Sequence, residues 1–116
     1  MMTPRLPTRL WVEALVHRAQ VAGAAGFIVQ HGDDARGDVL LKVARLDGTA
    51  AVYTPTMNMD GERIFLNLRV QGIGPDEKDV DRYVTRARQR DSDLWIVEIE
   101  DRHGRHFLTE DVDEGL

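Results

Sequence analysis

Two glutamates and a histidine near the end of the chain are its best candidates for chemistry. Glu98 and Glu100 alternate along a predicted strand, and residues 102–104 (Arg-His-Gly) fit a three-residue hairpin loop. That loop pairs Glu100 with His106, which places all three side chains on one face of adjacent strands. Two carboxylates and an imidazole could bind a divalent metal or share acid–base work. The plainer interpretation is a solvated end of a sheet with one favourable Glu–His pair.

Two other polar groups could also form sites. His31, Asp33 and Asp34 offer metal ligands, but two aspartates in a glycine-bounded loop are more simply turn formers, because Asp bonds its own backbone there. The four arginines of residues 82–90 make one end of a predicted helix basic and could contact RNA or an acidic partner. Cations at a helix C-terminus also complement the helix dipole, which is the simpler explanation.

The composition excludes several classes of function. The 116 residues include no cysteine, which rules out disulfides, thiolate zinc sites and cysteine nucleophiles. A formal net charge of −5 argues against broad, phosphate-driven binding of nucleic acid. No apolar run approaches the ~20 residues needed to span a bilayer, so we expect no membrane segment and a cytoplasmic location. No cofactor is expected.

The first predicted helix, over residues 9–22, is unusually apolar around its circumference. A helix that lies on a sheet hides a stripe of about 100° or somewhat more. The apolar side chains here form two separate sets, one of them Val12, Val16 and Ala19, the other Leu10, Ala14 and Val21. Burying both sets requires a second contact surface. We therefore expect Val12, Val16 and Ala19 to bind a partner, with a homo-oligomer as the simplest assembly.

Short strands are expected to follow this helix. Strands are predicted over residues 27–31 and 39–46, and a two-residue turn at Asp47-Gly48 pairs Val43 with Val52. A second such turn at residues 60–61 would put the next strand out of phase with Val52. A bulge, or a longer loop over residues 57–61, is expected to correct the phase.

The second half predicts a helix and a last strand or hairpin. After Pro75, the apolar stripe of a surface helix is formed by Val80, Tyr83, Val84 and Ala87. The apolar run over residues 94–97 predicts a central strand with Trp95 buried. The hairpin that follows would also pair Asp101 with Arg105 and Ile99 with Phe107. Residues 1–7 read as a loose lead-in and residues 110–116 as a frayed acidic tail.

Three segments resemble a known family. They are residues 5–16 (RLPTRLWVEALV), 43–48 (VARLDG) and 93–108 (DLWIVEIEDRHGRHFL). Together they resemble the small alphaproteobacterial proteins catalogued as domain of unknown function 1491. The resemblance runs over nearly the whole chain and implies a bacterial cytosolic protein of one domain. It supplies no catalytic residues.

The sequence thus predicts one α+β domain over residues 1–116. Its expected order is an N-terminal helix, a four-strand antiparallel meander, a second helix and a C-terminal strand or hairpin, with both helices on one face of the sheet. Two functions stay open. The first is a non-enzymatic interaction module that self-associates, and the alternative is a small metal-dependent or acid–base enzyme centred on Glu98, Glu100 and His106.

Overall fold

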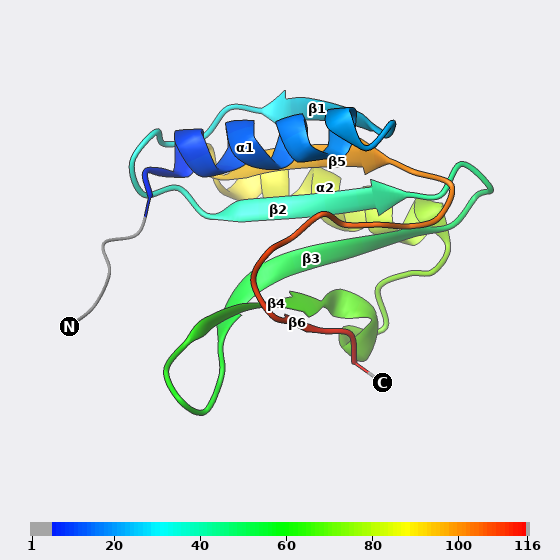
Figure 1. Ribbon diagram of the computed structural model, residues 1–116. Helices are drawn as coiled ribbons and strands as arrows, with labels where there is room; N and C mark the ends of the chain where they lie inside the picture. Colours follow the sequence, from blue (N-terminus) through cyan, green and yellow to red (C-terminus); the bar gives the residue numbers. More distant parts are fainter. Residues whose placement is uncertain (1–5, 116) are drawn as a thin grey trace.

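The computed structural model describes residues 6–115, so most of the predicted lead-in, residues 1–5, lies outside the described residues. The described residues form two α-helices and a six-stranded sheet, and Figure 1 shows their arrangement. The helices are α1 (Thr8–Val21) and α2 (Glu77–Arg90), and a short 3₁₀ helix, η1 (Leu68–Gln71), follows the fourth strand. The strands are β1 (Ala25–Gln30), β2 (Val39–Ala44), β3 (Ala50–Met57), β4 (Arg63–Asn67), β5 (Trp95–Glu100) and β6 (Val112–Asp113).

The predicted α+β class is confirmed, but the strand order differs from a four-strand meander. The order is β1-β5-β2-β3-β4-β6, with β5 antiparallel to β1 and parallel to β2. Only β2, β3 and β4 form a continuous antiparallel meander. The insertion of β5 follows from its apolar run, because a strand that is apolar on both faces is most stable inside a sheet.

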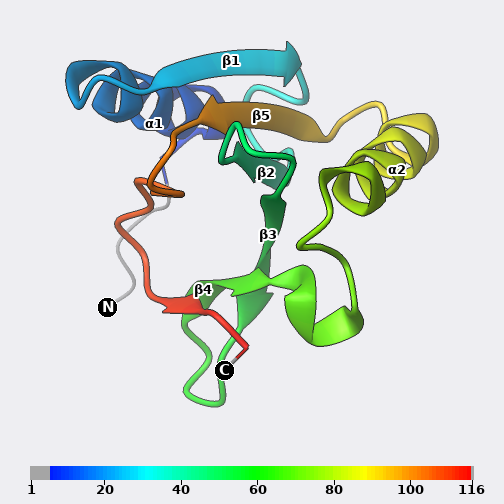
Figure 2. The same cartoon turned by 90° about the vertical axis from the view of Figure 1, so that its right-hand side faces the viewer.

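The two helices cover opposite faces of the sheet, not one face as expected (Figure 2). On one face, α1 buries Leu15 among Leu41 and Val97. On the other, α2 buries Val80 among Leu40 and Ile96. Side chains alternate along a strand, and all six residues of β2 are buried, so this strand requires a layer on each side. The predicted stripe of α2 forms part of the second layer.

The turn between β2 and β3 explains the phase conflict found in the sequence. Val43 pairs with Ala51, one residue away from the predicted Val52. The loop holds three residues, 46–48, because Leu46 adopts a left-handed backbone with φ of 64°. This shift turns Val52 toward α2, and the expected longer loop is confirmed between Met57 and Arg63.

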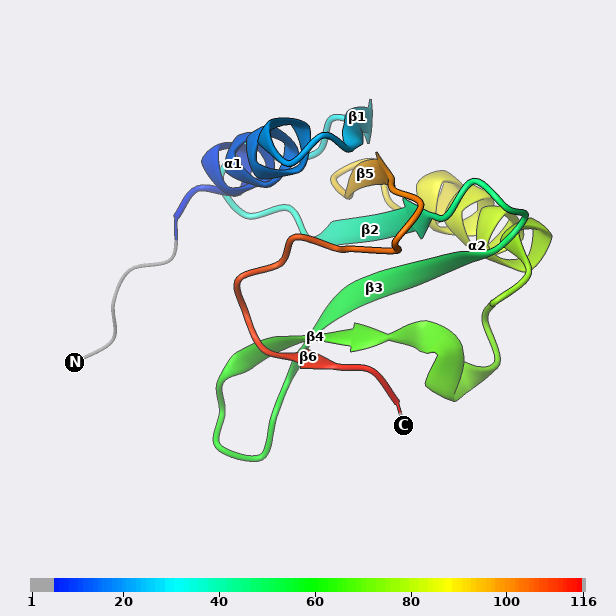
Figure 3. The ribbon, with the colours of Figure 1, turned by 45° about the vertical axis from the view of Figure 1, so that its right-hand side comes forward.

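The C-terminal segment does not form the predicted hairpin. After β5 it crosses the α1 side of the sheet, and β6 then pairs with β4 in parallel (Figure 3). Asp101 and Arg105 do meet, but inside a tight turn: the Asp101 carboxylate accepts hydrogen bonds from both the backbone N–H and the guanidinium of Arg105. The acidic tail is not frayed through residue 115. Besides the pairing of β6 with β4, Glu110 accepts a hydrogen bond of 2.6 Å from Trp11 Nε1.

Candidate functional site

The structure does not bring the predicted trio together. Glu98 and Glu100 alternate with Trp95, Val97 and Ile99 on β5, so they lie on the α2 side of the sheet. Glu100 pairs with β1 and β2 and has no His106 opposite it, so the predicted pairing is wrong.

His106 lies on the other side of the sheet, against Tyr53 of the α1-side core, with ring centroids 5.3 Å apart. Within residues 6–115 no group of three or more metal-ligating side chains is close enough to hold an ion.

Glu98 belongs to a cluster around a buried lysine. Lys42 on β2 is 8% exposed, and its Nζ lies 2.6 Å from Asp81, 2.7 Å from Glu77 and 2.8 Å from Glu98. Burial alone would lower the pKa of this ammonium, but hydrogen bonds to the three carboxylates outweigh it and raise the pKa. The cluster joins α2 to β2 and β5 and keeps Lys42 charged, which suits a structural cation better than a base.

His106 stands beside a second polar cluster, which includes a buried tyrosine. The Tyr53 hydroxyl and the Asn67 amide both donate to Glu114, at 3.4 and 3.0 Å. Burial, with the Glu114 carboxylate nearby, raises the pKa of Tyr53 to about 12. Burial lowers the pKa of His106, partly opposed by Glu114 at 3.9 Å. At neutral pH both the phenol and the imidazole are therefore uncharged.

A cavity of about 430 Å³ opens next to this cluster. Its polar lining includes Tyr53, Asn67 and Glu114, and two arginines, Arg45 and Arg69, stand at its rim. Apolar side chains of β2, β3 and the loop before α2 complete the wall: Val43, Ala50, Ala51, Ile73 and Pro75. Sequence patterns missed this site because its residues come from four separate segments that converge only through the sheet order.

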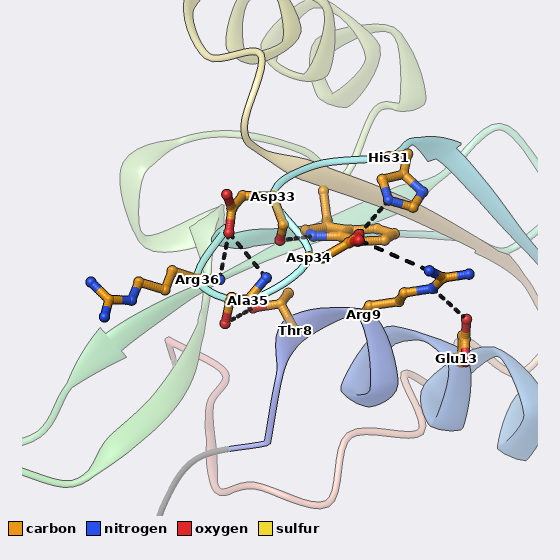
Figure 4. Close-up of polar contacts among 9 residues, drawn as sticks. Thr8, Arg9, Glu13, His31, Asp33, Asp34, Ala35 and Arg36 are labelled. Atoms are coloured by element: carbon orange, nitrogen blue, oxygen red, sulfur yellow. Dashed lines mark hydrogen bonds and ion pairs between the residues drawn. The ribbon is translucent and has the colours of Figure 1, made fainter.

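The loop over residues 31–38 is built by its aspartates (Figure 4). The Asp33 carboxylate accepts hydrogen bonds from the backbone N–H groups of Ala35 and Arg36, which confirms its role as a turn former. His31 Nε2 lies 2.6 Å from Asp34, which also faces Arg9 of α1 at 3.9 Å. These contacts fasten the loop to α1 and leave no assembled ligand set.

Two of the predicted partner-binding residues of α1, Val12 and Ala19, are buried inside the monomer, and Val16 is partly buried. Val12 and Ala19 are 0% exposed, and both belong to the core between α1 and the sheet. Val16 packs on Gly26 of β1, where the missing side chain lets the helix approach closely. These three side chains therefore form the face of α1 that packs on the sheet, not the surface that the sequence predicted to bind a partner. The opposite set is the exposed one, with Leu10 at 52% and Val21 at 74%.

Strand β1 presents an exposed apolar edge instead. It stands at one end of the sheet order, and Phe27, Ile28 and Val29 are 48%, 43% and 40% exposed. Phe27 and Ile28 point to opposite faces, since their partners on β5 are Glu98 and Val97. A sequence signal was present: residues 21–30 contain no charged side chain in a chain that is 30% charged.

Fold and surface together define an α+β protein with a mixed sheet covered on both faces. In the described part of the chain, neither helix is long and apolar enough to cross a membrane. The chain belongs to the family of proteins of unknown function DUF1491, whose model matches residues 6–109. The resemblance seen in the sequence is thereby confirmed.

Similar solved structures include proteins from Caulobacter crescentus and A. tumefaciens. A crystal structure of a DUF1491 family protein from Caulobacter crescentus is 44% identical, with a TM-score of 0.85, covering 94% of this chain and 100% of that one. An NMR structure of a DUF1491 family protein from the same organism is 43% identical, with a TM-score of 0.82 over 97% and 100% of the two chains. A solution structure of an A. tumefaciens protein is 26% identical, with a TM-score of 0.74 over 97% and 100%. No curated protein matches.

Proposed function

We propose that this protein is a non-enzymatic interaction module of the bacterial cytoplasm that self-associates through the free edge of β1. The observation that carries the proposal is the exposure of three consecutive large apolar side chains, Phe27, Ile28 and Val29, on an edge strand. Backbone N–H and C=O groups of alternate residues point away from β5 along this edge. Such an unpaired row is a template for another strand.

Most edge strands carry features that prevent pairing, and here the two edges of the sheet differ. At the far edge, β6 has only two residues, and one of them is Asp113. At the near edge, β1 has six residues with neither charge nor proline. Its one irregularity lies between Ile28 and Gln30, which leaves residues 25–28 in regular register. The near edge is therefore much less protected.

A second copy of the chain is the occupant that the charges favour. The net charge of −5 makes two copies repel each other at most surfaces. In an antiparallel pair related by a two-fold axis, β1 meets itself, so the uncharged residues 21–30 face their own copy. No like charges oppose each other there. The result would be a sheet continuous across both protomers.

The alternative function, a metal-dependent or acid–base enzyme, required Glu98, Glu100 and His106 in one pocket. Glu98 forms an ion pair of 2.8 Å with Lys42 on the α2 side of the sheet, while His106 contacts Tyr53 on the α1 side. No observation in the described residues favours that reaction centre, and the interaction module is the function that the geometry supports best.

Disulfide trapping tests the β1 edge directly, because the wild-type chain has no cysteine. Single variants Phe27→Cys, Ile28→Cys and Val29→Cys would bracket the two-fold axis. We expect at least one of them to form a disulfide-linked dimer under mild oxidation at micromolar concentration. Met59→Cys is the matched control, because Met59 is fully exposed in the loop between β3 and β4. After the same oxidation, this variant should run as a monomer on a non-reducing gel.

A charge variant gives the complementary result. Phe27→Lys places a cation beside its own copy, so the assembled form should dissociate while the melting temperature of the monomer changes little. Met57→Lys, at another exposed position, is the control. Equal cross-linking of Met59→Cys and the β1 variants, or an assembly that Phe27→Lys leaves intact, would contradict the proposed edge.

A further inference from the structure

We infer that the cavity beside Tyr53 is a binding site for a small amphipathic organic anion, such as an aromatic carboxylate or a phosphate monoester. This site is independent of the β1 edge. Its volume of about 430 Å³ lies within the range of small-molecule sites, roughly 300–1,000 Å³. A cavity of ~150 Å³ already holds benzene, so this one has room for a ring and a charged group.

The charge at the rim selects an anion. Arg45 and Arg69 both line the cavity, and neither guanidinium forms an ion pair with a carboxylate of residues 6–115. Among the described residues, Glu114 is the only carboxylate in the lining, and its Oε1 already accepts from Tyr53 and Asn67. Two guanidinium groups that form no ion pair within residues 6–115, both at the mouth of one cavity, are suited to a carboxylate or phosphate.

Arg45 lies against the turn that follows β5. Gly104 in this turn has a left-handed φ of 70°, and a Cβ at that position would lie 2.7 Å from Arg45 Nη1. The guanidinium therefore packs directly on the backbone of Gly104, which also lines the cavity.

The wall and the floor specify the rest of the ligand. Val43, Ala51 and Ile73 offer an apolar surface for a ring or a short alkyl body. At the floor, Tyr53 and Asn67 are each 4% exposed and provide fixed polar groups. Buried polar groups beside an apolar wall are the usual means by which a pocket orients a ligand. A purely apolar molecule would leave both arginines unused.

Amide NMR titration with phenyl phosphate and benzoate tests the site, and benzyl alcohol serves as the uncharged probe of similar size. We expect the two anions at millimolar concentration to shift the amide signals of Thr49, Ala51 and Gly104 in a saturable way. Benzyl alcohol should bind about tenfold more weakly or not at all, because it lacks the charge that the arginines recognise.

Arginine variants assign the effect to the rim. Arg45→Gln and Arg69→Gln should each weaken anion binding by about tenfold, since each removes one charge-assisted contact. Arg36→Gln removes the same charge from an exposed loop and should leave binding unchanged. The unperturbed amide spectrum of each variant shows that it is folded. Absence of saturable shifts at these three amides, or shifts that survive unchanged in both cavity variants, would overturn the inference.

Discussion

Lys42 shows how a single buried charge links a helix to the sheet. Its ammonium faces Glu77 and Asp81 of α2 and Glu98 of β5, all within 2.8 Å. Removal of the cation would leave three carboxylates facing one another with no counter-ion. The sequence showed the carboxylate of Glu98 but gave no sign of this partner, because the parallel pairing of Lys42 with Glu98 depends on the position of β5.

Lys42→Met should therefore lower the free energy of unfolding at pH 7 by about 3 kcal/mol. In the wild type the hydrogen bonds to the three carboxylates raise the lysine pKa, so its stabilising contribution is fully present at pH 7, below the ordinary value of 10.5. Urea denaturation at pH 7 measures the loss, with Lys78→Met as the exposed control.

Trp95 was predicted to be buried, and the prediction is confirmed at 0% exposure. Its Nε1 also donates a 2.7 Å hydrogen bond to the Asp33 carbonyl oxygen, so it anchors the loop over residues 31–38. Trp95→Ala should cost about 3–5 kcal/mol of unfolding free energy, and Trp95→Phe about half as much. Melting curves measure this. An alanine variant that melts within a few degrees of wild type would contradict the placement of β5.

Asp101 carries a pH dependence with a definite sign. The hydrogen bond from the Arg105 guanidinium, aided by the Arg105 backbone N–H, lowers the pKa of Asp101 from 3.8 to about 2. Its stabilising contribution is complete above pH 3.8 and is lost as the pH falls through about 2.

Asp101→Asn should consequently destabilise the protein by about 1–3 kcal/mol at pH 7, and the difference from wild type should shrink toward pH 2. Urea unfolding across that range measures the difference, and Arg102→Gln, at an exposed neighbour, is the control. A difference that stays constant down to pH 2 would mean that the carboxylate is not bound to Arg105.

At the scale of elements, local patterns predicted both helices, the buried β5 and the longer loop before β4. They failed where two segments that are far apart in the sequence pair with each other in the sheet. The position of β5 between β1 and β2 is one case, and the pairing of β6 with β4 is another. The predicted register of β2 against β3 was wrong by one residue. The cause is Leu46, which adopts a left-handed backbone that β-turn rules assign to Gly or Asn.

The predicted Glu–His site was likewise limited by what local sequence patterns can show. Residue types suggested a Glu–His cluster on one hairpin, and a three-residue loop made the pairing plausible. Asp101 instead folds back on Arg105 and directs the chain across the sheet, which carries His106 to the opposite face from Glu98. The cavity near Tyr53 could not have been predicted, since its lining depends on that crossing.

The C-terminal segment forms a strap across the α1 side of the sheet. Its residues 110–116 had been predicted from the sequence to be frayed. Trp11 stacks on Phe65 at 5.4 Å and donates to Glu110, and the Phe65 backbone N–H donates to the Asp111 carbonyl oxygen. A chain ending at Thr109 should lose about 2–4 kcal/mol of unfolding free energy, because β4 and Trp11 lose these partners. Thermal unfolding checks this, and an unchanged midpoint would indicate a dispensable tail.

On the scale of the whole molecule, the distribution of charged residues and of exposed apolar side chains identifies one sheet edge that is open to pairing. Both faces of the sheet are covered by helices or by the C-terminal strap, and the β6 edge is short and acidic. Within residues 6–115, only β1 combines an open edge, consecutive exposed apolar side chains and a neutral sequence. Self-association had been expected from the first helix. The structure buries Val12 and Ala19, and the unpaired surface is the neighbouring strand.

The solution mass of the wild-type protein tests the central proposal most directly. Multi-angle light scattering on samples from low to high micromolar concentration should show the mass rise from one chain to two, and Phe27→Lys should hold the mass at one chain throughout. Physiological salt keeps the general repulsion between acidic chains small, so the comparison reports the β1 edge. A wild type that stays at the mass of one chain at high micromolar concentration would contradict the account.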